Sequence, residues 1–66
     1  MFYLIETNKA GHMRKIRKGT KYRMDMAIKT ITELRNKDDD RTLTIHNFKN
    51  DTEIMEFIRA HNRSKQ

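Results

Sequence analysis

The most regular hydrophobic pattern of the chain lies between residues 20 and 37. Its apolar residues follow one another at intervals of three, one, three and three: Met24, Ala27, Ile28, Ile31 and Leu34. This spacing places all of them on one stripe of an α-helix. Thr20 is a candidate N-cap for this helix, and Asp25 is a competing one. The aspartates of residues 38–40 are expected to end it, because carboxylates oppose the helix dipole at a C-terminus.

Two strands joined by a tight turn are expected at the start of the chain. Residues 2–6 are mostly aromatic or branched and predict the first strand, with both faces apolar. Such a strand is typical of the centre of a sheet, or of a sheet whose second face meets a partner. Asn8 and Gly11 have the spacing of a type I turn. Residues 12–18 are then expected to return as a second strand, with a short helical turn as the alternative.

Basic residues dominate this second strand. Strict alternation would place Arg14, Ile16 and Lys18 on one face. Lys15 and Arg17 would then lie on the other face, and Ile16 is the only expected core residue. So many Lys and Arg residues are typical of an edge strand, where charge discourages pairing with another chain.

The second half of the chain predicts one more strand and one more helix. Residues 41–48 alternate as a half-buried strand does, with Leu43 and Ile45 on one side and polar residues on the other. Asn50 or Asp51 is expected to cap the last helix. The buried stripe of that helix is predicted to consist of Ile54, Phe57, Ile58 and His61.

These elements predict a single small domain of residues 1–66 in the α+β class, in the order β-β-α-β-α, with residues 62–66 as a frayed polar tail. The sheet is expected to be three-stranded and mixed: the N-terminal hairpin plus one strand parallel to its first strand. The first strand is placed in the centre, and both helices are expected to cover one face, which gives two layers. The other face would then expose a mixed surface of Tyr3, Ile5, Thr42, Thr44 and His46.

The chain has 66 residues, of which 35% are hydrophobic and 36% are charged. A chain of this size has marginal stability, and without Cys no disulfide, thiolate nucleophile or Cys-based zinc site can form. The small core predicts self-association into a homodimer. The sequence shows no apolar run of about 20 residues and no basic, then apolar, leader. A cytoplasmic protein without a membrane partner is therefore expected.

The formal net charge is +6, and the whole excess lies in residues 1–36. Between Lys9 and Arg23 the sequence has seven basic residues and no acidic one. Clustered cations bind phosphates by releasing counterions, which predicts a nucleic-acid-binding protein that contacts the backbone with little sequence specificity. The expected contact residues are Lys9, Arg14, Lys15, Arg17, Lys18, Lys21 and Arg23. The alternative is a solvated edge strand that charge keeps soluble.

Protein binding is the alternative function, either as an interaction module or as an inhibitor. Apolar side chains on a surface that ought to be polar mark interfaces, and Tyr is enriched in them. The expected interface residues are Tyr3, Ile5, Thr44 and His46, with the Met-containing helix surfaces as a second choice. In this case the positive charge would steer the protein to an acidic partner.

No catalytic residue, metal site or cofactor is predicted. His12, His46 and His61 are far apart in the sequence and form no paired metal-ligand motif. Residues 38–40 lack the spacing of a calcium loop and are interpreted as a solvated loop that can supply counter-charge to Arg41 or to a neighbouring subunit. A Gly-rich phosphate loop is missing, and a chain this short has little room for a closed pocket. A non-enzymatic regulatory or accessory protein is therefore expected.

Overall fold

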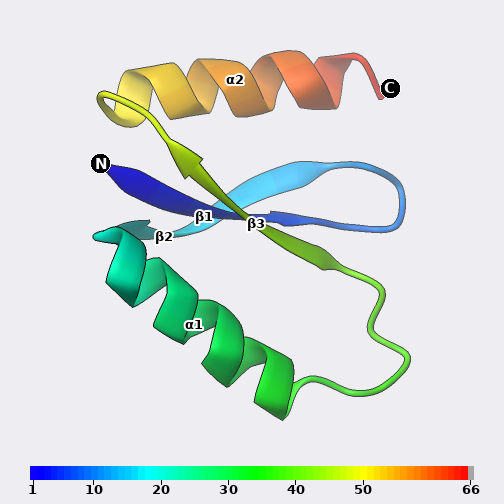
Figure 1. The fold of residues 1–66 in the computed structure, drawn as a ribbon. Helices are drawn as coiled ribbons and strands as arrows, with labels where there is room; N and C mark the ends of the chain where they lie inside the picture. Colours follow the sequence, from blue (N-terminus) through cyan, green and yellow to red (C-terminus); the bar gives the residue numbers. More distant parts are fainter. Residues whose placement is uncertain (66) are drawn as a thin grey trace.

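A computed structural model describes residues 1–65 of the chain (Figure 1). Two strands are followed by a helix, a third strand and a second helix, which is the order that the sequence predicted. The elements are β1 (Phe2–Thr7), β2 (Met13–Gly19), α1 (Lys21–Leu34), β3 (Thr42–Asn47) and α2 (Asp51–Arg63). Among these residues, neither helix combines the length and the apolar character needed to span a membrane.

All three strands of the sheet are antiparallel to their neighbours, in the order β2-β1-β3. β1 lies in the centre, as its two apolar faces predicted, but the expectation that β3 runs parallel to it is wrong. α1 connects β2 to β3 and carries the chain back to the end of the sheet where β2 began (Figure 1). β3 therefore runs in the direction of β2 and, like β2, is antiparallel to β1.

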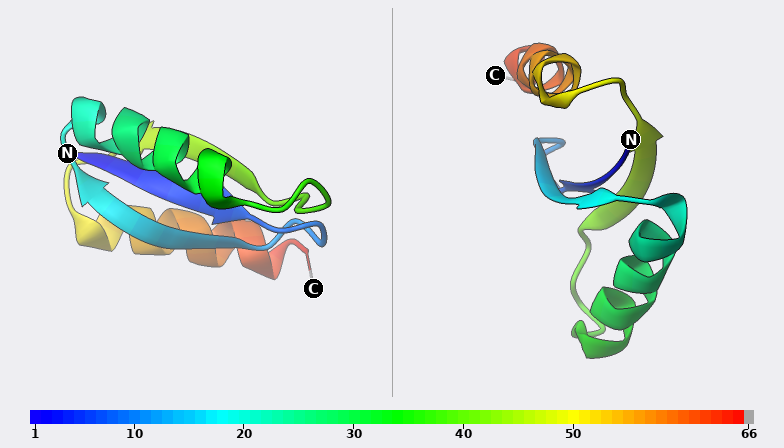
Figure 2. Two further views of the ribbon diagram at one scale, coloured as in Figure 1. Left: turned by 90° about the horizontal axis from the view of Figure 1, so that it is seen from below. Right: turned by 90° about the vertical axis from the view of Figure 1, so that its left-hand side faces the viewer.

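The two helices cover opposite faces of the sheet (Figure 2). On one face, Tyr3 and Ile5 form the main core with Ile54 and Ile58 of α2. On the other face, Met24 of α1 is only 2% exposed. The expected arrangement of two layers, with both helices on one face, is therefore wrong. β1 explains the difference, because its apolar residues point to both faces and one helical layer would leave half of them in water.

Each helix begins at one of the two N-cap candidates that the sequence offered, Thr20 and Asn50. The Thr20 hydroxyl accepts a hydrogen bond from the Arg23 amide at 3.2 Å. The side-chain oxygen of Asn50 accepts one from the Glu53 amide at 3.0 Å. Each bond satisfies an amide that has no partner inside its helix, so Thr20 rather than Asp25 is the N-cap of α1.

The ends of both helices differ from the expectation. α1 stops at Leu34, where Arg35 takes an extended conformation, so the helix ends before the run of aspartates. The Leu34 side chain, which was expected on the buried stripe, is 81% exposed. α2 continues to Arg63, so the tail expected over residues 62–66 begins later, and Gln66 lies outside the described residues.

The turn between β1 and β2 is confirmed at Asn8–Gly11. The Gly11 amide donates to the Asn8 carbonyl at 2.9 Å, and Gly11 has a φ of 90°, in the region that favours glycine. The His61 ring of α2 donates from Nε2 to the Gly11 carbonyl at 2.7 Å. This histidine therefore ties the end of α2 to the hairpin turn.

Candidate nucleic-acid interface

A bulge in the hairpin changes how the basic residues of β2 are distributed. Leu4 of β1 pairs with Arg17, whereas the next residue, Ile5, pairs with Lys15, so Ile16 is an extra residue in β2. An extra residue reverses the alternation of the side chains that follow it. The two faces expected from strict alternation are therefore wrong for the second half of the strand.

The cations of β2 consequently form two rows along one edge of the sheet. Arg14 and Arg17 share the face that α1 covers, and Lys15 and Lys18 share the face that α2 covers. Because β2 is an outer strand, both rows reach the same margin of the sheet. We call this margin the basic edge, defined by Arg14, Lys15, Arg17 and Lys18.

On the α2 side, the lysines lie beside the first turn of that helix. Lys18 Nζ is 3.1 Å from Asp51 Oδ2, and Lys15 Nζ is 5.9 Å from the centre of the Tyr3 ring. The Tyr3 hydroxyl donates to Asp51 Oδ1 at 2.7 Å. This hydroxyl and Lys18 hold the pKa of Asp51 below its usual range, and the same carboxylate raises the pKa of Tyr3.

On the α1 side, a groove of about 450 Å³ lies between β2 and residues 23–31 of α1. Arg17 lines it from the strand and Arg23 from the helix; Lys18 also borders it, although its side chain lies on the α2 face with Asp51. The rest of its lining is apolar except for one threonine: Ile16, Met24, Met26, Ala27, Thr30 and Ile31. Cations from two elements therefore converge on a channel whose lining contains no carboxylate.

The other predicted cations differ in their partners. Lys21 Nζ lies 3.2 Å from Asp25, one helical turn later. Arg17, Arg23 and Lys9 form no ion pair with a carboxylate of residues 1–65. Lys9 lies in the hairpin turn, at the other end of β2 from α1, and does not line the groove. Arg17 and Arg23 are therefore the cations of the groove that are free to bind an external anion.

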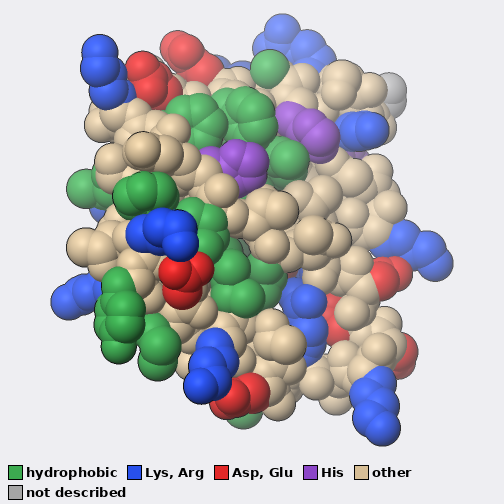
Figure 3. Space-filling model, viewed as in Figure 1, with side chains coloured by type: hydrophobic (Ala, Val, Ile, Leu, Met, Phe, Trp, Pro, Cys, Tyr) green, Lys and Arg blue, Asp and Glu red, His purple; other side chains and the backbone are tan. Residues whose placement is uncertain are grey.

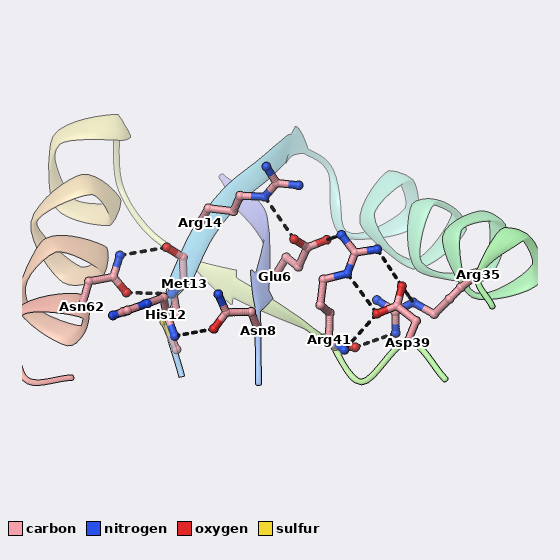
Figure 4. A network of polar contacts seen from close by, with 9 residues as sticks. All are labelled: Glu6, Asn8, His12, Met13, Arg14, Arg35, Asp39, Arg41 and Asn62. Carbon is pink, nitrogen blue, oxygen red and sulfur yellow. Dashed lines mark hydrogen bonds and ion pairs between the residues drawn. The ribbon is translucent and has the colours of Figure 1, made fainter. Parts of the chain in front are cut away.

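A polar network that the sequence did not predict surrounds Glu6 at the other end of the sheet (Figure 4). The carboxylate of Glu6 is 11% exposed; Arg14 Nε lies at 3.0 Å from it and Arg41 Nη1 at 3.5 Å. Arg41 donates to Asp39 from Nε at 2.9 Å and from Nη2 at 2.6 Å, which holds the pKa of Asp39 far below its usual range. Arg35 Nη1 donates to the Arg41 carbonyl at 2.6 Å.

This network fixes the role of two residues named from the sequence. The counter-charge expected for Arg41 from the aspartate run is confirmed, and Asp39 supplies it. Arg14, by contrast, holds a nearly buried carboxylate of the sheet, so part of its charge is already used within the domain. The signal for this in the sequence is a lone Glu6 at the end of an otherwise apolar strand.

The sheet face that was expected to be an interface is not a surface. Tyr3 and Ile5 are fully buried beneath α2. The expectation that they are exposed for a partner is wrong, because the chain covers them with its own second helix. Thr44 and His46 are half-buried, and their side chains are hydrogen-bonded to each other at 2.9 Å.

His46 belongs to an aromatic cluster with Phe48 and Phe57. Figure 3 shows that histidine and hydrophobic side chains gather on this side of the molecule. The His46 ring stacks on Phe48, with the centroids 6.1 Å apart, and lies 5.4 Å from the ring of Phe57. Within residues 1–65, no three His, Cys, Asp or Glu side chains come together in a way that could hold a metal ion.

Comparisons with protein-family models, with curated proteins and with solved structures give no match to this chain. The functional proposal therefore rests on the surface of this molecule alone.

Proposed function

We propose that this protein binds the phosphate backbone of a nucleic acid along its basic edge, with Arg17 and Arg23 as the central contacts. The observation that carries the proposal is the groove between β2 and α1, which both arginines line and whose lining contains no carboxylate. Phosphates that bind there displace condensed counterions, which favours association without reading the sequence. The net charge of +6 adds long-range attraction.

The ion pairs of the neighbouring lysines are compatible with this function. In the pairs Lys18–Asp51 and Lys21–Asp25, both side chains are at least half exposed. Exposed ion pairs contribute about 0–1 kcal/mol, so a phosphate can replace either carboxylate at little cost. Arg14 belongs to the basic edge, but we leave it out of the contact set because its guanidinium is already paired with Glu6.

The test is a titration of fluorescent duplex DNA, single-stranded DNA and RNA at low and at near-physiological salt. Binding should weaken steeply as salt rises, because each neutralised phosphate of a duplex contributes a slope of about −0.9 to the logarithmic plot. Preference among the three probes would identify the nucleic acid. Absence of binding at low salt, in a protein carrying +6, would refute the proposal.

A matched pair of variants distinguishes binding in the groove from a general effect of net charge. R17Q with R23Q removes both free arginines of the groove. K49Q with R59Q removes the same charge from exposed positions outside the groove. The first variant should lose most of the affinity, and the second should lose little. An equal loss in both would mean that only the net charge matters.

The apolar floor of the groove favours a second candidate function, the binding of an acidic protein segment. A phosphate backbone makes no use of Met24, Met26 or Ala27, whereas an acidic amphipathic helix or strand would bury its apolar residues there. M26Q distinguishes the two candidates, because it adds no charge and only makes the floor polar. It should leave nucleic-acid binding unchanged but weaken the binding of a synthetic peptide of alternating Glu and Leu.

A further inference from the structure

The two outer strands of the sheet are protected very differently against pairing with another chain. β2 carries four Lys or Arg residues and a break in its register. Both features discourage edge-to-edge association. β3 has the sequence TLTIHN, with no Lys, Arg, Asp or Glu, and its register with β1 is regular throughout. It lies at the front of the molecule in the view of Figure 1, between the two helices. β3 is therefore an uncharged and regular edge.

The backbone groups that β3 turns to this open edge can be assigned. The Phe48 amide donates to the Met1 carbonyl at 3.0 Å, and the Met1 amino group donates to the Phe48 carbonyl at 3.1 Å. This mutual pair continues the register of β1 and β3, so inward-pointing residues recur at every second position. The amides and carbonyls of Leu43, Ile45 and Asn47 therefore point away from β1.

The charge distribution allows a second copy of this chain as the occupant of the β3 edge, because that strand carries no charged residue. Each copy carries +6, so two copies repel wherever their basic edges come close. β2 and β3 lie at opposite margins of the sheet, and pairing through β3 keeps the two basic edges as far apart as possible. In a continuous sheet they would be about 24 Å apart, at about 4.8 Å per strand. This distance exceeds the screening length of about 8 Å at physiological salt.

We propose that two copies of this protein pair through β3 in antiparallel orientation, with the two-fold axis at Ile45. In this register Ile45 lies opposite Ile45, Leu43 opposite Asn47, and Thr44 opposite His46. All outward amides and carbonyls of both strands then find partners, and the side chains of each face stay on that face. The inference is independent of nucleic-acid binding, because it uses the opposite edge of the sheet.

The first test is the molecular mass in solution, measured by sedimentation over a range of concentrations at low and at high salt. We expect a monomer–dimer equilibrium that salt strengthens, because it screens the repulsion between the two basic copies. A wild-type protein that stays monomeric at all concentrations would overturn the proposal, and so would a dimer that salt weakens.

Charged variants locate the interface. T42K with N47K adds two cations at exposed positions of β3, and T32K with N36K adds the same two cations at exposed positions of α1 and the loop after it. In the proposed register position 42 lies opposite Phe48 and position 47 opposite Leu43, so the added cations do not face one another directly. They nevertheless bring four positive charges into one strand pair, and this repulsion should raise the dimer dissociation constant of the β3 variant more than about tenfold. The α1 variant should dimerise almost as the wild type does. Equal dimerisation of the two variants would exclude the β3 edge.

A disulfide test defines the register and does not require a destabilised dimer. The chain has no Cys, so a single introduced thiol can form a disulfide only with another copy. In the proposed register I45C lies opposite itself at a Cα distance of about 5.5 Å, which suits a disulfide. L43C lies opposite Asn47 and should crosslink far more slowly. Equal crosslinking of the two variants would refute this register.

Discussion

α2 buries Ile54 and Ile58 against one face of the sheet, whereas Met24 is the only residue of α1 that is buried against the other. This difference in burial is unexpected from the sequence, in which α1 has the more regular apolar stripe. The reason lies in the sheet. The face beneath α1 receives Arg14 and Arg17 from β2, so β2 adds only Ile16 to the apolar residues that β1 and β3 offer there. The apolar stripe of α1 is longer than the apolar surface available to cover it.

Polar contacts increase the difference between the two helices. The Asn62 side chain accepts from the Met13 amide at 2.7 Å and donates to the Met13 carbonyl at 2.9 Å. Tyr3 and Gly11 also bond to side chains of α2. Within residues 1–65, no side chain of α1 hydrogen-bonds to the sheet. α2 is therefore held by hydrogen bonds to the sheet and the hairpin turn as well as by packing, whereas α1 is held by packing alone. α1, the less firmly held helix, is the one that forms a side of the groove.

The largest expected contrast is between truncations in the two helices. I54A should lower the free energy of unfolding by about 2–5 kcal/mol, because it leaves a cavity against Tyr3 and Ile5. L34A should change it by less than about 0.5 kcal/mol, because that side chain is exposed. Urea denaturation measures both values. A large loss in L34A would mean that α1 packs as tightly as α2.

The next effect concerns the anchor at the end of α2. N62A should cost about 1–3 kcal/mol, because it leaves the partly buried amide and carbonyl of Met13 without their partner. N36A, at an exposed position after α1, is the matched control and should change the stability little. The same denaturation experiment compares them. Equal stability of N62A and the wild type would show that the end of α2 is held by packing alone.

Removing an N-cap should cost less stability than removing the Asn62 anchor, and the region that opens faster should differ between the two helices. T20A and N50A each remove an N-cap bond worth about 1 kcal/mol. In T20A, faster amide hydrogen exchange should be confined to α1, because a loosely packed helix opens on its own. In N50A, faster exchange should spread to the strands that α2 covers. Global acceleration in T20A would contradict the proposed independence of α1.

The smallest effect is a pH dependence at the start of α2. The Tyr3 hydroxyl and Lys18 lower the pKa of Asp51 in the folded state, so this carboxylate stabilises the fold above its unfolded pKa and ceases to do so as pH falls below about 4. Y3F removes the hydroxyl. The difference in stability between Y3F and the wild type should therefore shrink between pH 7 and pH 3. A constant difference would mean that the hydroxyl does not act through the charge of Asp51.

Local patterns in the sequence determined the elements and most of their limits. The apolar character of both faces of β1 predicted its central place, and the turn at Asn8–Gly11 was identified correctly. For each helix the sequence offered two N-cap candidates, of which the structure uses Thr20 and Asn50. These features depend on residues a few positions apart, whose interactions follow from the geometry of a helix, strand or turn. The cluster of basic residues is equally a property of the sequence, and its role in nucleic-acid binding stays a prediction.

Tertiary structure alone decided which faces those elements use. The direction of β3 follows from the path of α1, and the position of α2 follows from the need to cover Tyr3 and Ile5. No pattern in the sequence of β2 predicted the bulge at Ile16. The bulge separates the cations into two rows, and Ile16 lines one wall of the groove. Burial and side-chain direction depend on contacts between residues distant in the chain, so they are fixed only when the layers pack together.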